Sequence, residues 1–121
     1  MEKTILIVDD SNSIRNLVEF TLKDAGFNIL SAINGKDALN FFDGRTIHLL
    51  LTDLHMPIMS GMELIAEVRK MDTYQFMPIL FLTTETQVEI KKEAKNLGAT
   101  GWIVKPFNGE KLIATIRKVI R

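Results

Sequence analysis

The stretch Thr4-Ile5-Leu6-Ile7-Val8-Asp9-Asp10 decides the fold of this 121-residue chain. Its unbroken apolar run predicts a strand that is covered on both faces, as strands are in a parallel sheet. The same pattern, a short apolar run that ends at a polar residue, recurs three times along the sequence. The runs are residues 49–52 before Asp53, residues 79–82 before Thr83 and Thr84, and residues 102–104 before Lys105.

Segments with helical spacing alternate with strand-like segments along the whole chain. Strands are predicted at residues 4–8, 28–32, 49–52, 79–82 and 102–104. Helices are predicted after Ser11-Asn12-Ser13 up to Gly26, from residue 34 to Gly44, after Ser60-Gly61, and over residues 88–97 and 110–120. In the first helix, the residues expected to face inward are Ile14, Leu17, Val18, Leu22 and Ala25. This alternation predicts an α/β fold, a doubly wound five-stranded parallel sheet flanked by five helices, in one domain over residues 1–121.

The composition excludes several classes of protein. Lysine plus arginine and aspartate plus glutamate number 15 each, so the net charge is zero. This balance provides neither a global basic field for nucleic acid nor a polybasic anchor for a membrane. The absence of cysteine excludes disulfides and thiolate metal sites. The first apolar run is too short for a signal peptide or a membrane span, so we expect a soluble, cytoplasmic domain.

The polar residues at the strand ends form a candidate site. Because the carboxyl ends of parallel strands meet at one edge of a sheet, we expect them to share a crevice. Crowded carboxylates repel one another, and a hard cation such as Mg2+ relieves that repulsion with oxygen ligands. One carboxylate could then attack a phosphoryl donor while a lysine pairs with a phosphate oxygen. The alternative is that these are solvated loop groups, a surface lysine and a threonine that bonds local backbone.

Four stretches resemble the receiver domain of two-component response regulators, namely residues 5–10 (ILIVDD), 52–57 (TDLHMP), 82–84 (LTT) and 104–107 (VKPF). The resemblance implies a flavodoxin-like sheet of strand order 2-1-3-4-5, a topology of which the chemotaxis receiver is a known example. It implies that Asp53 accepts a phosphoryl group from a sensor histidine kinase, and that the Lys105-Pro106 peptide bond is cis. The implied Mg2+ ligands are Asp9, Asp10, Asp53 and the backbone carbonyl of His55, and the implied phosphoryl contacts are Thr83 and Lys105.

The resemblance also implies roles for three further residues. Trp102 stands three residues before the lysine, where relatives carry an aromatic, more often tyrosine or phenylalanine, that changes rotamer on activation. The alternative is that Trp102 is a plain core or edge aromatic. His55 and Glu85, two residues after the aspartate and the threonine, are implied to tune hydrolysis of the acyl phosphate. His55 could instead be an exposed loop residue without such a role.

Two surfaces are candidates for protein contacts. The resemblance implies an output face made of the helix at 88–97, the fifth strand and the last helix. The lysines on that helix, Lys91, Lys92 and Lys95, are either solubilising groups or contacts for an acidic helical peptide. Around the first helix, the candidate kinase contacts are Asn12, Arg15 and Asn16, which are otherwise ordinary solvated residues.

These features predict a stand-alone phospho-aspartate switch of the chemotaxis CheY type. We expect a monomer that is not a turnover enzyme, because it catalyses only its own phosphorylation and dephosphorylation. Its output would be binding to a protein target in chemotaxis or motility signalling, with the flagellar motor switch as a candidate. Two alternatives stay open: a receiver domain of a larger regulator or hybrid kinase, and a phosphate shuttle or sink without an output of its own.

Two other classes of protein fit the sequence less well. A phosphatase of the haloacid-dehalogenase type needs an acid two residues after its aspartate nucleophile, where this chain has Ser11. It also needs a cap, for which the chain has no spare length. A flavodoxin-like electron carrier needs an anion-binding loop after the first strand, and Asp9-Asp10 would repel the flavin phosphate. The sequence therefore favours a phosphoryl receiver over either class.

Overall fold

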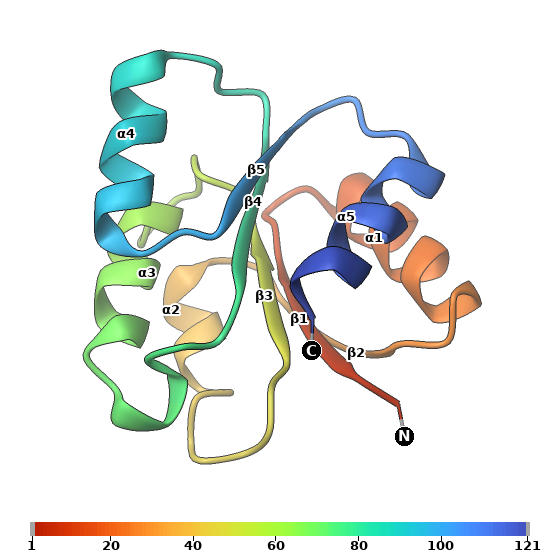
Figure 1. Cartoon of the computed structure of the whole chain (residues 1–121), viewed down its shortest axis with the longest axis horizontal. Helices are drawn as coiled ribbons and strands as arrows, with labels where there is room; N and C mark the ends of the chain where they lie inside the picture. Colours follow the sequence, from red (N-terminus) through yellow and green to blue (C-terminus); the bar gives the residue numbers. More distant parts are fainter. Residues whose placement is uncertain (1, 121) are drawn as a thin grey trace.

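Five parallel strands form a single sheet in the order β2-β1-β3-β4-β5 (Figure 1). The computed structural model describes residues 2–120 of the chain. The strands are β1 (Thr4–Val8), β2 (Asn28–Ala32), β3 (Leu49–Thr52), β4 (Ile79–Thr83) and β5 (Gly101–Val104). The predicted fold class and strand order are confirmed. The order reverses between β1 and β3, which is where doubly wound sheets bind their ligands.

Helices cover both faces of the sheet. Figure 1 shows α1 and α5 on one side and α2, α3 and α4 on the other. Their bounds are α1 (Asn12–Asp24), α2 (Gly35–Leu39), α3 (Gly61–Arg69), α4 (Val88–Leu97) and α5 (Gly109–Val119), with a 3₁₀ turn at Asp72–Tyr74. Over residues 2–120, none of these helices has the length and apolar character needed to cross a membrane.

Side chains along β1 alternate between two cores. Ile5 and Ile7 pack in the core beneath α1 and α5, whereas Leu6 and Val8 pack in the core beneath α2, α3 and α4. Because both faces of the strand are covered, each of these four side chains is at most 2% exposed. This two-sided burial accounts for the unbroken apolar runs in the sequence and fixes the strand ends from which the polar residues project.

Two details of the helix predictions are wrong. Leu17 does not face inward but is 52% exposed, because the buried stripe of α1 runs through Val18 and Leu22, four residues apart. The second helix ends at Leu39 rather than continuing to Gly44. Beyond that point the backbone amides of residues 40–42 bond three residues back, as in a tight turn, although Phe42 stays buried.

A histidine completes the backbone pairing next to β1, which gives a testable pH dependence. The Thr4 N–H donates to His48 Nδ1 over 2.9 Å, and the His48 N–H donates to the Thr4 carbonyl over 2.8 Å. Burial, with the charge of Lys3, lowers the pKa of His48 below its ordinary value of 6.5. Protonation of Nδ1 would remove the acceptor for Thr4, which would cost about 1 kcal/mol.

Because the folded-state pKa of His48 is depressed, the unfolded chain binds more protons than the folded chain below about pH 6.5. We therefore expect the free energy of unfolding to be highest above pH 6.5 and to fall as the pH drops through that value. Urea denaturation between pH 5 and pH 7.5 measures this slope. His48→Asn keeps an acceptor that does not titrate, so it should flatten the slope. An unchanged slope in this variant would contradict the assignment.

Candidate phosphoryl site

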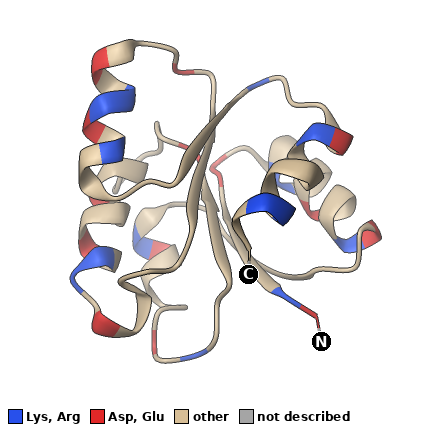
Figure 2. Ribbon diagram, in the orientation of Figure 1, with Lys and Arg blue, Asp and Glu red and all other residues tan. Residues whose placement is uncertain are grey.

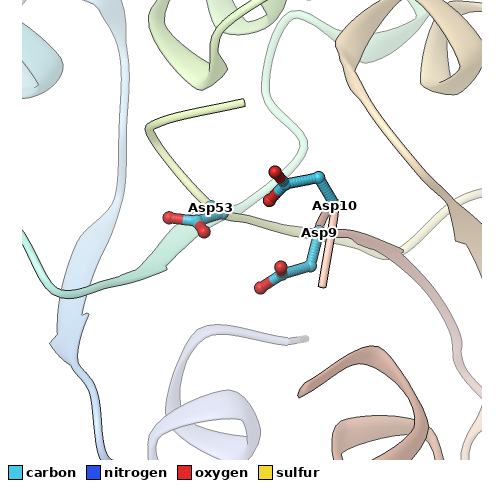
Figure 3. Close-up of side chains that lie close together, drawn as sticks. All are labelled: Asp9, Asp10 and Asp53. Carbon is cyan, nitrogen blue, oxygen red and sulfur yellow. The ribbon is translucent and has the colours of Figure 1, made fainter. Parts of the chain in front are cut away.

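Three carboxylates meet at the carboxyl edge of the sheet. Asp9 and Asp10 follow β1, Asp53 follows β3, and Figure 3 shows the three side chains gathered on one side of these loops. Asp9 is 3% exposed and Asp53 is 9% exposed, while Asp10 is open to solvent. One oxygen from each carboxylate lies within 4.8 Å of the others. The sequence prediction that these residues share a crevice therefore matches their placement.

Backbone amides hold the two buried carboxylates in place, and an arginine holds the backbone of Asp9. Asp53 Oδ1 accepts the N–H of Leu54 over 2.7 Å, and Asp9 Oδ1 accepts the N–H of Ser11 over 2.9 Å. Arg15, in the first turn of α1, donates from Nη1 to the Asp9 carbonyl over 2.8 Å and also bonds Asn12. Arg15 is thus tied to the loop that carries Asp9, a role that its sequence position alone did not reveal.

Lys105 lies between the buried carboxylates. Its Nζ donates to Asp9 Oδ2 over 2.8 Å and to Asp53 Oδ2 over 3.0 Å, and its side chain is 12% exposed. Burial acts to lower the pKa of Lys105, but the hydrogen bonds and charges of Asp9 and Asp53 outweigh that effect, so the pKa lies above the ordinary 10.5. The ammonium group therefore stays charged across the physiological range. The Lys105-Pro106 bond is cis, as the family resemblance implied.

Thr83, and not Thr84, is buried at the carboxyl edge of the sheet. Thr83 is the last residue of β4 and is fully buried, whereas Thr84 is exposed. The Thr83 carbonyl accepts the N–H of Lys105 over 2.9 Å, which joins the ends of β4 and β5 at this edge. Its hydroxyl accepts the N–H of Glu85 over 3.3 Å. The Thr83 hydroxyl thus links the end of β4 to the loop that leads to α4.

His55 and Glu85 form a hydrogen bond between two loops at the same edge. His55 Nε2 lies 2.9 Å from Glu85 Oε1, and the His55 side chain is 65% exposed. Glu85 Oε2 accepts the N–H groups of Thr86 and Gln87 just before α4. The hydrogen bond with His55 and these backbone bonds lower the pKa of Glu85, so its carboxylate is ionised. The implied role of the pair in tuning hydrolysis stays a prediction.

Trp102 is linked to the same loop. Its indole Nε1 donates to the Glu85 carbonyl over 2.9 Å, and its ring lies 5.0 Å from the Phe81 ring. Lys91 of α4 places its ammonium 5.9 Å from the indole centroid, within cation–π range. Trp102 therefore contacts β4, the β4–α4 loop and α4 together. Whether it moves on phosphorylation stays a prediction.

A glycine lets the Asp53 loop fold back over the end of β3. The Gly61 N–H donates to the Leu54 carbonyl over 2.8 Å. A Cβ at Gly61 would lie 2.3 Å from the Asp53 carbonyl oxygen and 2.6 Å from the Phe81 ring. No side chain fits between those groups, so this position requires glycine. Ser60 and Glu63 cap the start of α3 reciprocally, which fixes where the loop ends.

The donor set fits a hard divalent cation. Three carboxylates whose oxygens lie within 4.8 Å of one another provide the oxygen ligands that Mg2+ prefers. They also carry more negative charge than Lys105 alone neutralises. A cation bound beside Asp10 would relieve the repulsion that remains among the three carboxylates. Chemically, the site can hold a cation, offer the Asp53 carboxylate as a nucleophile and place an ammonium group beside it.

Comparison with known proteins establishes the family. The model of the response regulator receiver domain family matches residues 5–117, nearly the whole chain. The chain therefore belongs to the response regulator receiver domain family. The solved chemotaxis protein CheY4 of Vibrio cholerae superposes with a TM-score of 0.95 at 45% identity, covering 99% of this chain and 100% of that one.

Curated relatives fall into two groups by length. The chemotaxis protein CheY of Pseudomonas aeruginosa is 35% identical over 116 residues, covering 95% of this chain and 94% of that protein. A probable transcriptional regulator, ycf29 of Porphyra purpurea, is 30% identical over 120 residues, covering 99% of this chain and 57% of that protein. The chain spans about half the length of the transcriptional regulators that it matches. Membership of the receiver domain family supports, in general, a role in phosphorelay signalling.

Proposed function

We propose that this chain accepts a phosphoryl group from a sensor histidine kinase on Asp53, in a Mg2+-dependent reaction in the cytoplasm, and thereby changes its affinity for a protein target. The observation that carries this proposal is the arrangement around Asp53. One of its oxygens is held by the Leu54 N–H and the other by Lys105, beside Asp9 and Asp10. Membership of the receiver family supports the same reaction.

In the proposed transfer, Asp53 attacks the phosphorus of a phosphohistidine. An oxygen–phosphorus bond forms on the carboxylate as the nitrogen–phosphorus bond breaks. The phosphohistidine reacts with its other ring nitrogen protonated, so the electrons of the broken bond return to the leaving nitrogen and the histidine leaves as a neutral imidazole. In this proposal Lys105, which donates to Asp53 Oδ2, would pair with an oxygen of the transferred group, and the Thr83 hydroxyl would contact the same group.

Asp9, Asp10, Asp53 and the backbone carbonyl of His55 would hold the Mg2+. When bound, the ion would neutralise the carboxylates and the incoming phosphoryl oxygens. Backbone groups of the chain position two of these carboxylates. The Ser11 N–H bonds one oxygen of Asp9, and the Leu54 N–H bonds one oxygen of Asp53. We propose no turnover of small substrates, because catalysis here ends with phosphorylation of the chain itself and its reversal.

The face formed by α4, β5 and α5 is the proposed output surface. A hollow of about 260 Å³ lies between α4 and β5, lined by Lys91, Ala94, Lys95, Ala99, Thr100, Gly101 and Trp102. Figure 2 shows both signs of charge along α4, where Glu89 and Glu93 accompany the three lysines. The face is therefore not uniformly basic. We place acidic target segments at Lys91 and Lys95, which border the hollow, rather than along the whole helix.

Similarity over 94% and 100% of the length of two chemotaxis proteins supports chemotaxis or motility as the process. In this proposal the chain acts as a monomer, and the flagellar motor switch is a candidate target. The matches to longer transcriptional regulators support the second candidate, a receiver that acts within a larger protein. A phosphate shuttle without a target would share the site and differ only in lacking a phosphorylation-dependent partner.

Switching can be measured at Trp102, the one tryptophan in the sequence. Acetyl phosphate with Mg2+ should change its fluorescence, because the indole bonds the Glu85 carbonyl in the loop that also carries the Thr83 contact. The change should reverse as the acyl phosphate hydrolyses and should be absent with a chelator. Unchanged fluorescence in chains that carry the phosphoryl group by mass would contradict switching through this loop.

A further inference from the structure

The loop after Asp53 contains a strained isoleucine. Ile58 has a φ of 71°, and within residues 2–120 it is the only residue other than glycine with a positive φ. The Met59 N–H donates to the Pro57 carbonyl over 2.8 Å, so Ile58 is the centre of a three-residue turn. Such a turn with positive central φ is rare and strained, and a β-branched side chain is costly there. Asparagine or glycine would adopt this backbone at lower cost.

The Ile58 side chain gains little packing within the chain to offset this strain. It is 75% exposed, and Ile33, in the loop before α2, is 52% exposed. Both line one shallow hollow of about 320 Å³, together with Asn34, Lys36, Asp37 and Asn40. Strain that local packing does not explain indicates a function at the surface.

Close contacts join the segment between β2 and α2 to the loop between β3 and α3. The Gly35 N–H donates to the Met59 carbonyl over 3.3 Å, and a Cβ at Gly35 would lie 2.8 Å from Met59 Cγ. Asp37 accepts the N–H of Ile33 and Asn34 caps the start of α2, which fixes the other side of the hollow. These contacts hold the segments that carry Ile33 and Ile58 together. We call the border of the hollow that these two side chains form the rim.

The rim residues Ile33 and Ile58 lie at the same edge of the sheet as the phosphoryl site. Ile58 lies five residues after Asp53 in the loop that leaves β3, and Ile33 directly follows β2, so both stand at the carboxyl edge where Asp9 and Asp10 lie. We propose that Ile33 and Ile58 form an apolar contact for the protein that donates the phosphoryl group, beside its phosphohistidine. This inference rests on the proposed function. A protein must lay part of its surface over this edge to bring its histidine to Asp53, whereas a small phosphodonor need not.

The test compares the rate of phosphoryl transfer from a protein donor with the rate from a small-molecule donor. The protein donor is the histidine kinase core from the source cell that transfers its phosphoryl group fastest to the unaltered chain, and the small donor is acetyl phosphate. For Ile58→Asn we expect about tenfold slower transfer from the kinase, since an exposed apolar contact is lost. The acetyl phosphate rate should stay within about twofold. The melting temperature should rise by about 4 °C, because asparagine relieves the turn.

If Ile58→Asn is more stable than the unaltered chain and yet accepts the phosphoryl group more slowly from the kinase, the slower transfer reflects a lost docking contact and not misfolding. Ile33→Ser should slow kinase transfer without raising the melting temperature. Phe76→Ser is the matched control, since Phe76 is 89% exposed but precedes β4 at the opposite edge of the sheet. Unchanged kinase transfer in Ile58→Asn and Ile33→Ser, or equal slowing with both donors, would overturn the docking inference. Failure of the unaltered chain to react with acetyl phosphate would instead overturn the proposed function.

Discussion

Replacing Lys105 by methionine should slow phosphorylation by acetyl phosphate about 100-fold. The Lys105 ammonium donates to Asp53 Oδ2 over 3.0 Å, so it lies where charge develops on the transferred phosphoryl group. Methionine has similar length and no charge, which isolates the electrostatic effect. Mass spectrometry of the phosphorylated fraction over time measures the rate.

The same replacement should destabilise the chain when no metal is present. Asp9 and Asp53 are buried and would lose their counter-charge, at a cost of about 3 kcal/mol in the free energy of unfolding. Addition of Mg2+ should restore part of this loss, because the ion binds the folded chain. Because the pKa of Lys105 is raised, its stabilisation persists below pH 10.5 and is lost only as the pH rises beyond that value. Lys111→Met, an exposed lysine of α5, is the control. Unchanged stability and rate in Lys105→Met would contradict the assigned contacts.

Replacing Asp10 by asparagine should raise the Mg2+ concentration needed for half-maximal phosphorylation about 30-fold. Removing one negative charge at about 4 Å from a divalent cation costs about 2 kcal/mol even at the dielectric constant of water. Asp10 is exposed, in contrast to Asp9, so the fold does not depend on burying it. The rate with acetyl phosphate across a Mg2+ titration measures the effect.

The metal-free stability separates this effect from damage to the fold. Asp10→Asn should leave the free energy of unfolding unchanged or raise it, since repulsion among three close carboxylates falls. Asp72→Asn, in the 3₁₀ turn before β4, serves as a charge-matched control. A normal Mg2+ midpoint in Asp10→Asn would mean that Asp10 is not a ligand.

The strand ends were predictable because two-sided burial leaves a strong pattern in the sequence. The apolar run before Asp9 and the run before Asp53 fix where β1 and β3 stop, and parallel pairing then brings both carboxylates to one edge. The choice of Thr83 over Thr84 followed from the family resemblance, and the burial of Thr83 agrees with it.

Contacts that depend on side-chain direction were not predictable from spacing. Arg15 gave no signal of its bond to the Asp9 carbonyl, because an arginine in the first turn of a helix is usually solvated. Leu17 looked like a core residue because it is apolar, although it lies beside the buried stripe of α1 rather than on it.

The backbone conformation of Ile58 was not predictable either. Its positive φ has no signature in the sequence, since glycine or asparagine would be expected at such a position.

Whether the Asp53 carboxylate is the acceptor of the phosphoryl group is tested most directly by intact mass. The unaltered chain and Asp53→Asn are incubated with acetyl phosphate, each with Mg2+ and with a chelator. We predict a gain of one phosphoryl mass in the unaltered chain with Mg2+, and no gain in the other three samples. A gain that persists in Asp53→Asn, or no gain in a folded unaltered chain, would contradict the assignment.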